Sequence, residues 1–192
     1  MSESLTAFPS DGYTARWRAW EGEGDETLTL RWENEGWTAV GELTRERVTY
    51  VIRLTASWET SQFLLFRDQD EPDLWLGHDG RSQWGEINGA HRDDLDGCTD
   101  VSIHATPFTA TLPIRRLDLG VGESAEVTVA TIDVETLGVV PVGERYERIA
   151  PQRFRVTHLR TGIEREFSVD EYGLVHDDEG SFRRVQSSPS GE

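Results

Sequence analysis

The segment VTYVIRLTASW, residues 48–58, decides the fold class. Apolar side chains occupy every second position, and polar ones such as Thr49, Arg53 and Ser57 lie between them. A period of two places neighbouring side chains on opposite faces of a β-strand. The segment therefore predicts a strand with one buried face, and it directs Trp58, at the end of the run, toward the interior.

The same alternation recurs along the chain, with Gly, Asp and Asn between the runs. Leu28, Leu30 and Trp32 share one face, and only residues 90–95 have the character of a helix, a short one. Strands spaced by about ten residues are typical of antiparallel meanders that close into barrels or sandwiches. We predict an all-β, mainly antiparallel, barrel-like or half-barrel domain with few short helices. The other predicted strands are 37–43, 63–66, 74–76, 99–106, 113–119, 125–134, 153–159, 163–169 and 182–185.

The length of 192 residues suits one domain. We place this domain at residues 11–186 and predict flexible tails at 1–10 and 187–192, because the second is rich in Ser, Pro and Gly. The acidic start has no secretory signal, and no apolar run reaches the length of a membrane span. With a single cysteine, Cys98, no internal disulfide can form, so we expect a cytoplasmic protein.

The formal net charge is -17, and every basic residue is an arginine. Such a charge repels phosphate backbones and anionic lipid surfaces, so nucleic acid and acidic bilayers are not expected partners. An acidic chain without lysine is typical of salt-loving organisms, where salt screens the self-repulsion. The alternative is an acidic protein encoded by a GC-rich genome.

Residues 97–117 read GCTDVSIHATPFTATLPIRRL. This stretch resembles the hallmark of the putative glycolipid-binding family, formerly a domain of unknown function, and the resemblance extends from about Trp17 to Val185. It implies a mostly antiparallel β fold around an apolar interior, as in lipoprotein-carrier half-barrels. The chain departs from the hallmark at Ser102, where the family has an acid, and at Ala110, where it has Asn. If those groups bind a ligand, this protein has lost or changed the contact.

Within this stretch, Pro107 and Pro113 mark strand ends, because proline cannot donate a ladder hydrogen bond. Residues 106–113 are therefore expected to form a shaped loop, which is either a packed anchor or part of a ligand mouth. Arg115 and Arg116 would face opposite sides of the predicted strand 113–119. The inward arginine needs a carboxylate such as Asp100, or an anionic ligand group.

No catalytic apparatus is recognisable. Asp100, Ser102 and His104 share one strand face, but their spacing is too wide for a hydrolase triad. Cys98 is expected to be a core residue, because nothing nearby would lower its pKa. The histidines are scattered, so we predict no metal site and no cofactor.

The leading function is non-catalytic binding of an amphipathic small molecule, such as a glycolipid or fatty-acyl compound, in an apolar cavity. Its apolar part would lie against aromatic side chains, and its polar head would meet an arginine. Two alternatives stay open: an enzyme of unrecognised type acting on a small hydrophobic substrate, and a structural or interaction module with a packed interior. The candidate ligand-binding residues are Trp58, Trp84, Asp100, Thr106, Phe108, Thr109, Arg115 and Arg116.

Overall fold

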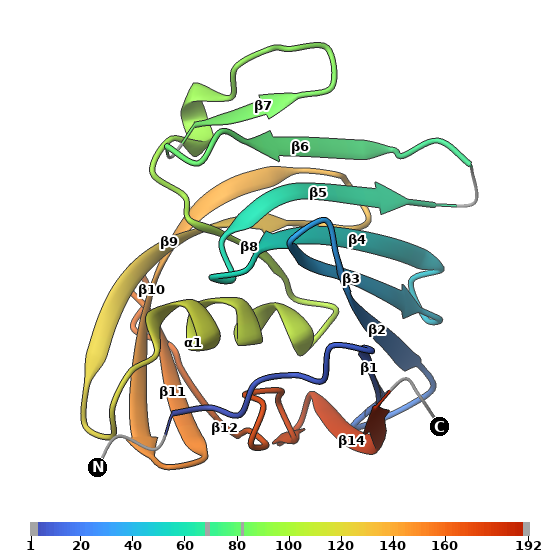
Figure 1. The fold of residues 1–192 in the computed structure, drawn as a ribbon. Helices are drawn as coiled ribbons and strands as arrows, with labels where there is room; N and C mark the ends of the chain where they lie inside the picture. The colour runs from blue at the N-terminus through green and yellow to red at the C-terminus, as the bar shows by residue number, and fades with distance from the viewer. Residues whose placement is uncertain (1–3, 68–69, 82, 190–192) are drawn as a thin grey trace.

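A computed structural model describes residues 4–67, 70–81 and 83–189. Strand makes up 52% of the structure and helix 7%, so the predicted all-β fold class is confirmed. The strands form two sheets that curve around one short helix, α1 (Thr111–Leu117), as a half-barrel (Figure 1). No helix in the described part of the chain is long and apolar enough to cross a membrane.

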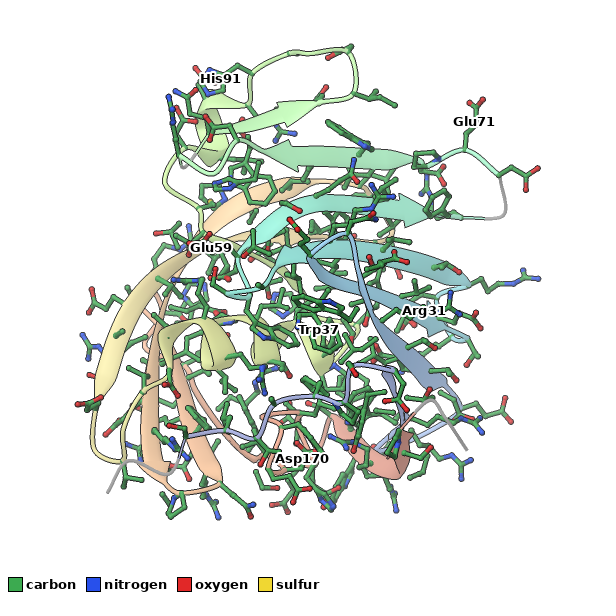
Figure 2. All side chains as sticks on the ribbon, viewed as in Figure 1. Arg31, Trp37, Glu59, Glu71, His91 and Asp170 are labelled. Carbon is green, nitrogen blue, oxygen red and sulfur yellow. The ribbon has the colours of Figure 1, made fainter. Side chains whose placement is uncertain are left out.

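The larger sheet has nine strands, and all of its neighbouring strands are antiparallel. Its spatial order is β13 (Asp177–Asp178), β14 (Phe182–Pro189), β1 (Tyr13–Ala19), β2 (Asp25–Glu33), β3 (Gly36–Leu43), β4 (Val48–Thr55), β5 (Thr60–Phe66), β6 (Leu74–His78) and β7 (Trp84–Glu86). Residues 48–55 of the segment VTYVIRLTASW form β4, whose inward face is buried. Figure 2 shows Trp37 inside the half-barrel near α1, while Arg31 and Glu71 point outward.

The smaller sheet has five strands in the order β12 (Glu164–Ser168), β11 (Arg153–His158), β10 (Val139–Ala150), β9 (Ser124–Ile132) and β8 (Asp100–Ile103). β8 and β9 are parallel, and the other pairs are antiparallel. β10 is the longest described strand, yet side-chain periodicity did not predict it, because residues 143–148, GERYER, are mostly charged.

The prediction of a strand at 113–119 is wrong, because Thr111–Leu117 form α1. Pro113 lies in the first turn of this helix, where a missing N–H costs no hydrogen bond. A short 3-10 turn, η2 (Phe108–Ala110), precedes α1, so much of the expected loop 106–113 is helical. Arg115 and Arg116 are consequently about 100° apart on a helix instead of on opposite faces of a strand.

Helix α1 connects the two cores. Leu112 packs in the cluster under the nine-stranded sheet, and Ile114 packs in the cluster under the five-stranded sheet. The short helix expected at 90–95 is reduced to a 3-10 turn, η1 (Asp93–Leu95), and the strand expected at 99–106 is limited to β8.

The described parts of the two predicted tails are packed against the domain. Phe8 is buried, and Thr6 N–H donates to the Glu171 carbonyl at 2.8 Å. At the other end, β14 extends to Pro189, which pairs with Tyr13. The Ser- and Pro-rich composition favoured a flexible tail, but β14 pairs with β1 through main-chain hydrogen bonds, which depend little on side-chain type. Residues 1–3 and 190–192 of the predicted tails lie outside the described residues.

Candidate functional site

A buried carboxyl group, Glu26, lies near the start of β2. It belongs to the inward face of the strand together with Leu28 and Leu30, and it is only 2% exposed. Its Oε1 accepts hydrogen bonds from the Tyr50 hydroxyl at 2.5 Å and from Thr106 Oγ1 at 2.7 Å. Its Oε2 is also buried but has no partner among the described residues.

Tyr50 reaches Glu26 by lying across β3. A Cβ built at Gly41 would fall 2.0 Å from the Tyr50 ring, so only glycine leaves room for the ring there. On its other side, the ring stacks on Phe108 with 6.4 Å between the centroids. Gly41 and Phe108 therefore fix the direction of the Tyr50 hydroxyl toward β2.

Two threonines hold the turn between β8 and η2. Phe108 N–H donates to Thr106 Oγ1 at 3.0 Å, and Ile103 N–H donates to Thr109 Oγ1 at 3.1 Å. These bonds satisfy main-chain groups that no sheet partner reaches. The turn thus presents the Thr106 hydroxyl to Glu26.

Burial raises the pKa of Glu26 from 4.5 to about 7. The hydrogen bonds from Tyr50 and Thr106 favour the charged form, but they do not compensate for the loss of hydration. Glu46 raises the pKa further by repulsion. Near neutral pH this carboxyl group therefore exists in both protonation states.

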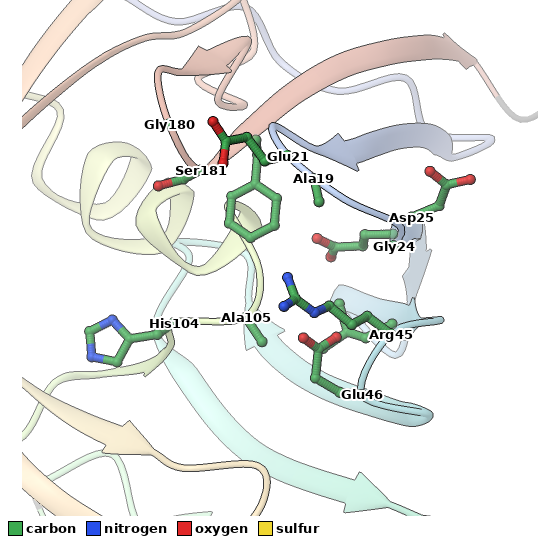
Figure 3. Close-up of a pocket in the computed structure, with 13 residues that line it drawn as sticks. Ala19, Glu21, Gly24, Asp25, Arg45, Glu46, His104, Ala105, Gly180 and Ser181 are labelled. Carbon is green, nitrogen blue, oxygen red and sulfur yellow. The ribbon is translucent and has the colours of Figure 1, made fainter.

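A cavity of about 430 Å³ opens beside Glu26 (Figure 3). Arg45 and Glu46, from the β3–β4 turn, reach into it, while Asp25 points away from its centre. The rest of the lining includes two further polar side chains, Glu21 and His104, and the small or apolar Ala19, Leu43, Ala105 and Phe182. The site combines a buried acid and a cation with an apolar wall.

Two further cavities border the same β8–η2 turn. One, of about 620 Å³, is lined by apolar side chains such as Ile132, Val134 and Val140 and by three carboxylates, those of Glu46, Asp133 and Glu135. The other, of about 290 Å³, lies against the inner face of the five-stranded sheet and includes Ser102, Tyr146 and Thr106. His104 lines all three cavities.

The sequence matches the model of the putative glycolipid-binding family over residues 14–184. The chain belongs to this family. A crystal structure of a DUF1089 family protein from Pseudomonas aeruginosa is similar, with 28% sequence identity, a TM-score of 0.67, and coverage of 86% of this chain and 88% of that chain. Among curated proteins, none matches the sequence.

The resemblance implies departures from the hallmark of the putative glycolipid-binding family at Ser102 and Ala110. Both residues line the cavity of about 290 Å³.

Asp100 and Arg116 form a buried ion pair. Asp100 is fully buried, and Arg116 approaches it through Nη2 at 2.6 Å and through Nε at 3.1 Å. Arg116 Nη2 also donates to Thr99 Oγ1 at 3.0 Å. The sequence suggested Asp100 as the carboxylate partner of either Arg115 or Arg116, and the structure pairs it with Arg116.

Arg115 lies in an aromatic cluster that also contains Trp58. Its guanidinium carbon is 4.6 Å from the Trp58 ring centroid and 4.8 Å from that of Phe8. Nη1 donates to the carbonyls of Tyr172 and Thr6 at 2.6 and 3.1 Å. No ion pair in the described part of the chain includes Arg115, and burial lowers its pKa to about 10.

The eight predicted site residues consequently fall into four places. Thr106, Phe108 and Thr109 build the turn beside Glu26, whereas Trp58 and Arg115 belong to the aromatic cluster. Asp100 and Arg116 pair with each other. Trp84 is buried on β7 and donates from Nε1 to the Cys98 carbonyl at 3.0 Å.

Sequence reasoning missed Glu26, Tyr50 and Arg45 as site residues. One signal was present for Glu26: extending the Leu28–Leu30 alternation by one step places a carboxyl group on the buried face. In contrast, nothing in the sequence pairs Glu26 with Thr106, which lies 80 residues later. Cys98 is a buried thiol whose pKa burial raises to about 11, which disfavours the nucleophilic thiolate form.

Within residues 4–67, 70–81 and 83–189, no three His, Cys, Asp or Glu side chains are arranged to hold a metal ion. The polar groups of the site are instead hydrogen-bonding groups: the carboxyl of Glu26 with the hydroxyls of Tyr50 and Thr106, further carboxylates such as Glu46, and the guanidinium of Arg45. Such groups recognise the hydroxyls of a polar small molecule.

Proposed function

We propose that the protein binds an amphipathic small molecule with a neutral polar head, such as a glycolipid, without converting it chemically. The observation that carries this proposal is the unpartnered, buried Oε2 of Glu26 beside a cavity. A buried polar atom without a hydrogen bond is costly, and a ligand hydroxyl would remove that cost.

The charges around Glu26 favour a neutral head over an anionic one. Glu46 and Glu21 line the same cavity, and Arg45 is the only arginine among the described residues that line it. A phosphate would be repelled by these carboxylates. A sugar head, by contrast, supplies donors to the carboxylates and acceptors to the guanidinium.

The adjacent cavity of about 620 Å³ is suited to the apolar chain. It shares Glu46, His104 and Ala105 with the polar cavity, so the head and the chain would lie side by side. Val140 in its wall is 55% exposed, and a chain placed there would remove this apolar surface from water.

Binding of dodecyl glucoside below its micelle-forming concentration, measured by isothermal titration calorimetry, tests the proposal. Glu26→Gln should weaken binding by about ten-fold, because one charged hydrogen-bond acceptor is lost. Glu33→Gln, on the exposed end of the same strand, is the matched control and should bind like the wild type. Absence of binding to the wild type, or equal binding by both variants, would contradict the proposal.

One observation favours the enzyme alternative. A carboxyl group with a pKa near 7 is suited to general acid–base catalysis. Mass spectrometry of the glucoside after prolonged incubation separates the two functions. We expect intact glucoside, and cleavage that depends on Glu26 would establish the enzyme.

A further inference from the structure

A second carboxyl–tyrosine pair lies on the other side of the β8–η2 turn. Glu144 and Tyr146 are two residues apart on β10 and therefore share its inner face. Tyr146 is buried, and burial raises the pKa of Glu144, as it does for Glu26. The hydroxyl of Tyr146 and the nearby Arg165, His104 and His158 oppose this rise.

The register of the sheet brings other polar groups to the same place. Glu144 is directly opposite His158 on β11, and the next row runs from Tyr146 through Val156 to Arg165 on β12. With Ser102 on β8, these side chains line the cavity of about 290 Å³. A sheet that covers a core normally presents apolar side chains there. This polar face, supplied by four strands, is instead half-exposed, so a ligand can reach it; Arg165 is 43% exposed and pairs with Asp178 at 3.4 Å.

The mixture of groups favours a neutral ligand here too. Glu144 disfavours an anion, while Arg165 disfavours a cation. Hydroxyl groups, which both donate and accept, match a carboxyl, a phenol, imidazoles and a serine.

The cavity beside Glu26 and the cavity beside Glu144 share part of their lining. His104, which is exposed, lines both of them. Thr106 lines the smaller cavity while its hydroxyl bonds to Glu26. A ligand that passed over His104 could therefore meet both carboxyl–tyrosine pairs at once.

We propose that the head group of the ligand consists of two linked sugar units, one bound beside Glu26 and Tyr50 and the other beside Glu144 and Tyr146. This inference rests on the proposed function, because it assigns the head group of the same ligand. The chain would remain in the apolar cavity, which also borders His104.

Dodecyl maltoside and dodecyl glucoside differ by one sugar unit and carry the same chain, so their affinities test the inference directly. The wild type should bind the maltoside about ten-fold more tightly or better, since the second unit adds hydrogen bonds. Glu144→Gln should remove this advantage and leave glucoside binding unchanged. Glu26→Gln should weaken both ligands, and Glu147→Gln, on the opposite face of β10, should weaken neither.

The outcomes separate this inference from the proposed function. Glucoside binding without a maltoside advantage, or an advantage that survives in Glu144→Gln, overturns the two-sugar head and leaves the proposed function intact. If neither compound binds the wild type, both fail. Should Glu144→Gln not fold, Tyr146→Phe, which keeps the buried ring, is read by the same criteria.

Discussion

The inside of the half-barrel is filled at one end of β1–β4 and hollow at the other. At the filled end, Phe8 packs against rings from four separate segments, with centroids 4.9 to 5.8 Å away: Tyr13, Trp37, Trp58 and Tyr172. At the hollow end, Glu26 and Tyr50 border a cavity of about 430 Å³. The sequence placed two candidate site residues, Trp58 and Arg115, at the filled end, but this cavity lies at the end that holds Glu26.

The difference shows how the same strands serve two purposes. Aromatic rings close a β interior because they bury a large area and interlock in tilted and stacked pairs. A carboxyl group placed on the same inward face prevents such closure, because it needs hydrogen-bond partners instead of packing. The proposed ligand site therefore lies where the apolar alternation is interrupted.

The largest expected effect is at the filled end. Trp58→Ala should lower the free energy of unfolding by about 3–5 kcal/mol, because it removes a buried ring from the cluster. Affinity for dodecyl glucoside should stay within about two-fold. Glu26 lies level with Val48 at the start of β4, whereas Trp58 follows the other end of that strand. Chemical denaturation and calorimetry measure the two quantities.

Trp32→Ala is the matched control for this change, because Trp32 is 43% exposed, and its cost should stay below about 1 kcal/mol. A Trp58 variant that is stable but unable to bind would move the ligand site to the aromatic end.

At the hollow end, the stability should depend on pH through Glu26. Its pKa is 4.5 when unfolded and about 7 when folded, so between these values the folded protein holds more protons. The Glu26 contribution is therefore complete below pH 4.5, falls by about 3 kcal/mol as the pH rises to 7, and is constant above. Denaturation of the wild type and Glu26→Gln across this range isolates the contribution as a difference. Parallel pH profiles of the two proteins would show that Glu26 titrates normally.

The two arginines of α1, Arg115 and Arg116, should differ in their contribution to stability. Arg116→Met strands the fully buried Asp100 and should cost about 3 kcal/mol, at the low end for buried pairs because Arg116 is partly exposed. Arg115→Met leaves no carboxylate behind and should cost about 1–2 kcal/mol for the two carbonyl bonds. Thermal melts of both variants test the order. Equal costs would mean that Asp100 finds another partner.

The smallest expected effect concerns neither end but the surface. If the charge of -17 reflects a saline cytoplasm, potassium chloride up to molar concentration should raise the melting temperature, with a gain on the order of 1 kcal/mol. The buried Asp100–Arg116 pair is shielded from salt, so the Arg116→Met penalty should not change. A melting temperature that falls with salt would contradict the halophilic interpretation.

Alternation alone was sufficient to predict β4, because the inward face of a strand follows from side-chain periodicity. Trp58 is buried as expected, but strand periodicity does not explain its burial. It was not sufficient for α1, where the β-like run TLPIRRL becomes helical once Leu112 and Ile114 can reach two different cores. Trp58 itself lies in a turn with φ of 68°, beyond the end of the strand that predicted it. The Glu26–Thr106 bond depends on tertiary contacts that no local pattern contains.

The bond from Phe108 N–H to Thr106 has a directional consequence. A main-chain amide can only donate, so it occupies one lone pair of Thr106 Oγ1, while the hydroxyls of Thr106 and Tyr50 both donate to Oε1 of Glu26. With Oε1 accepting both bonds, the acidic hydrogen of neutral Glu26 belongs on Oε2, which has no partner among the described residues. Below the pKa of Glu26, Oε2 carries a hydrogen that it can donate to a ligand oxygen. Above this pKa, Oε2 has lost the hydrogen and can only accept a hydrogen bond from the ligand.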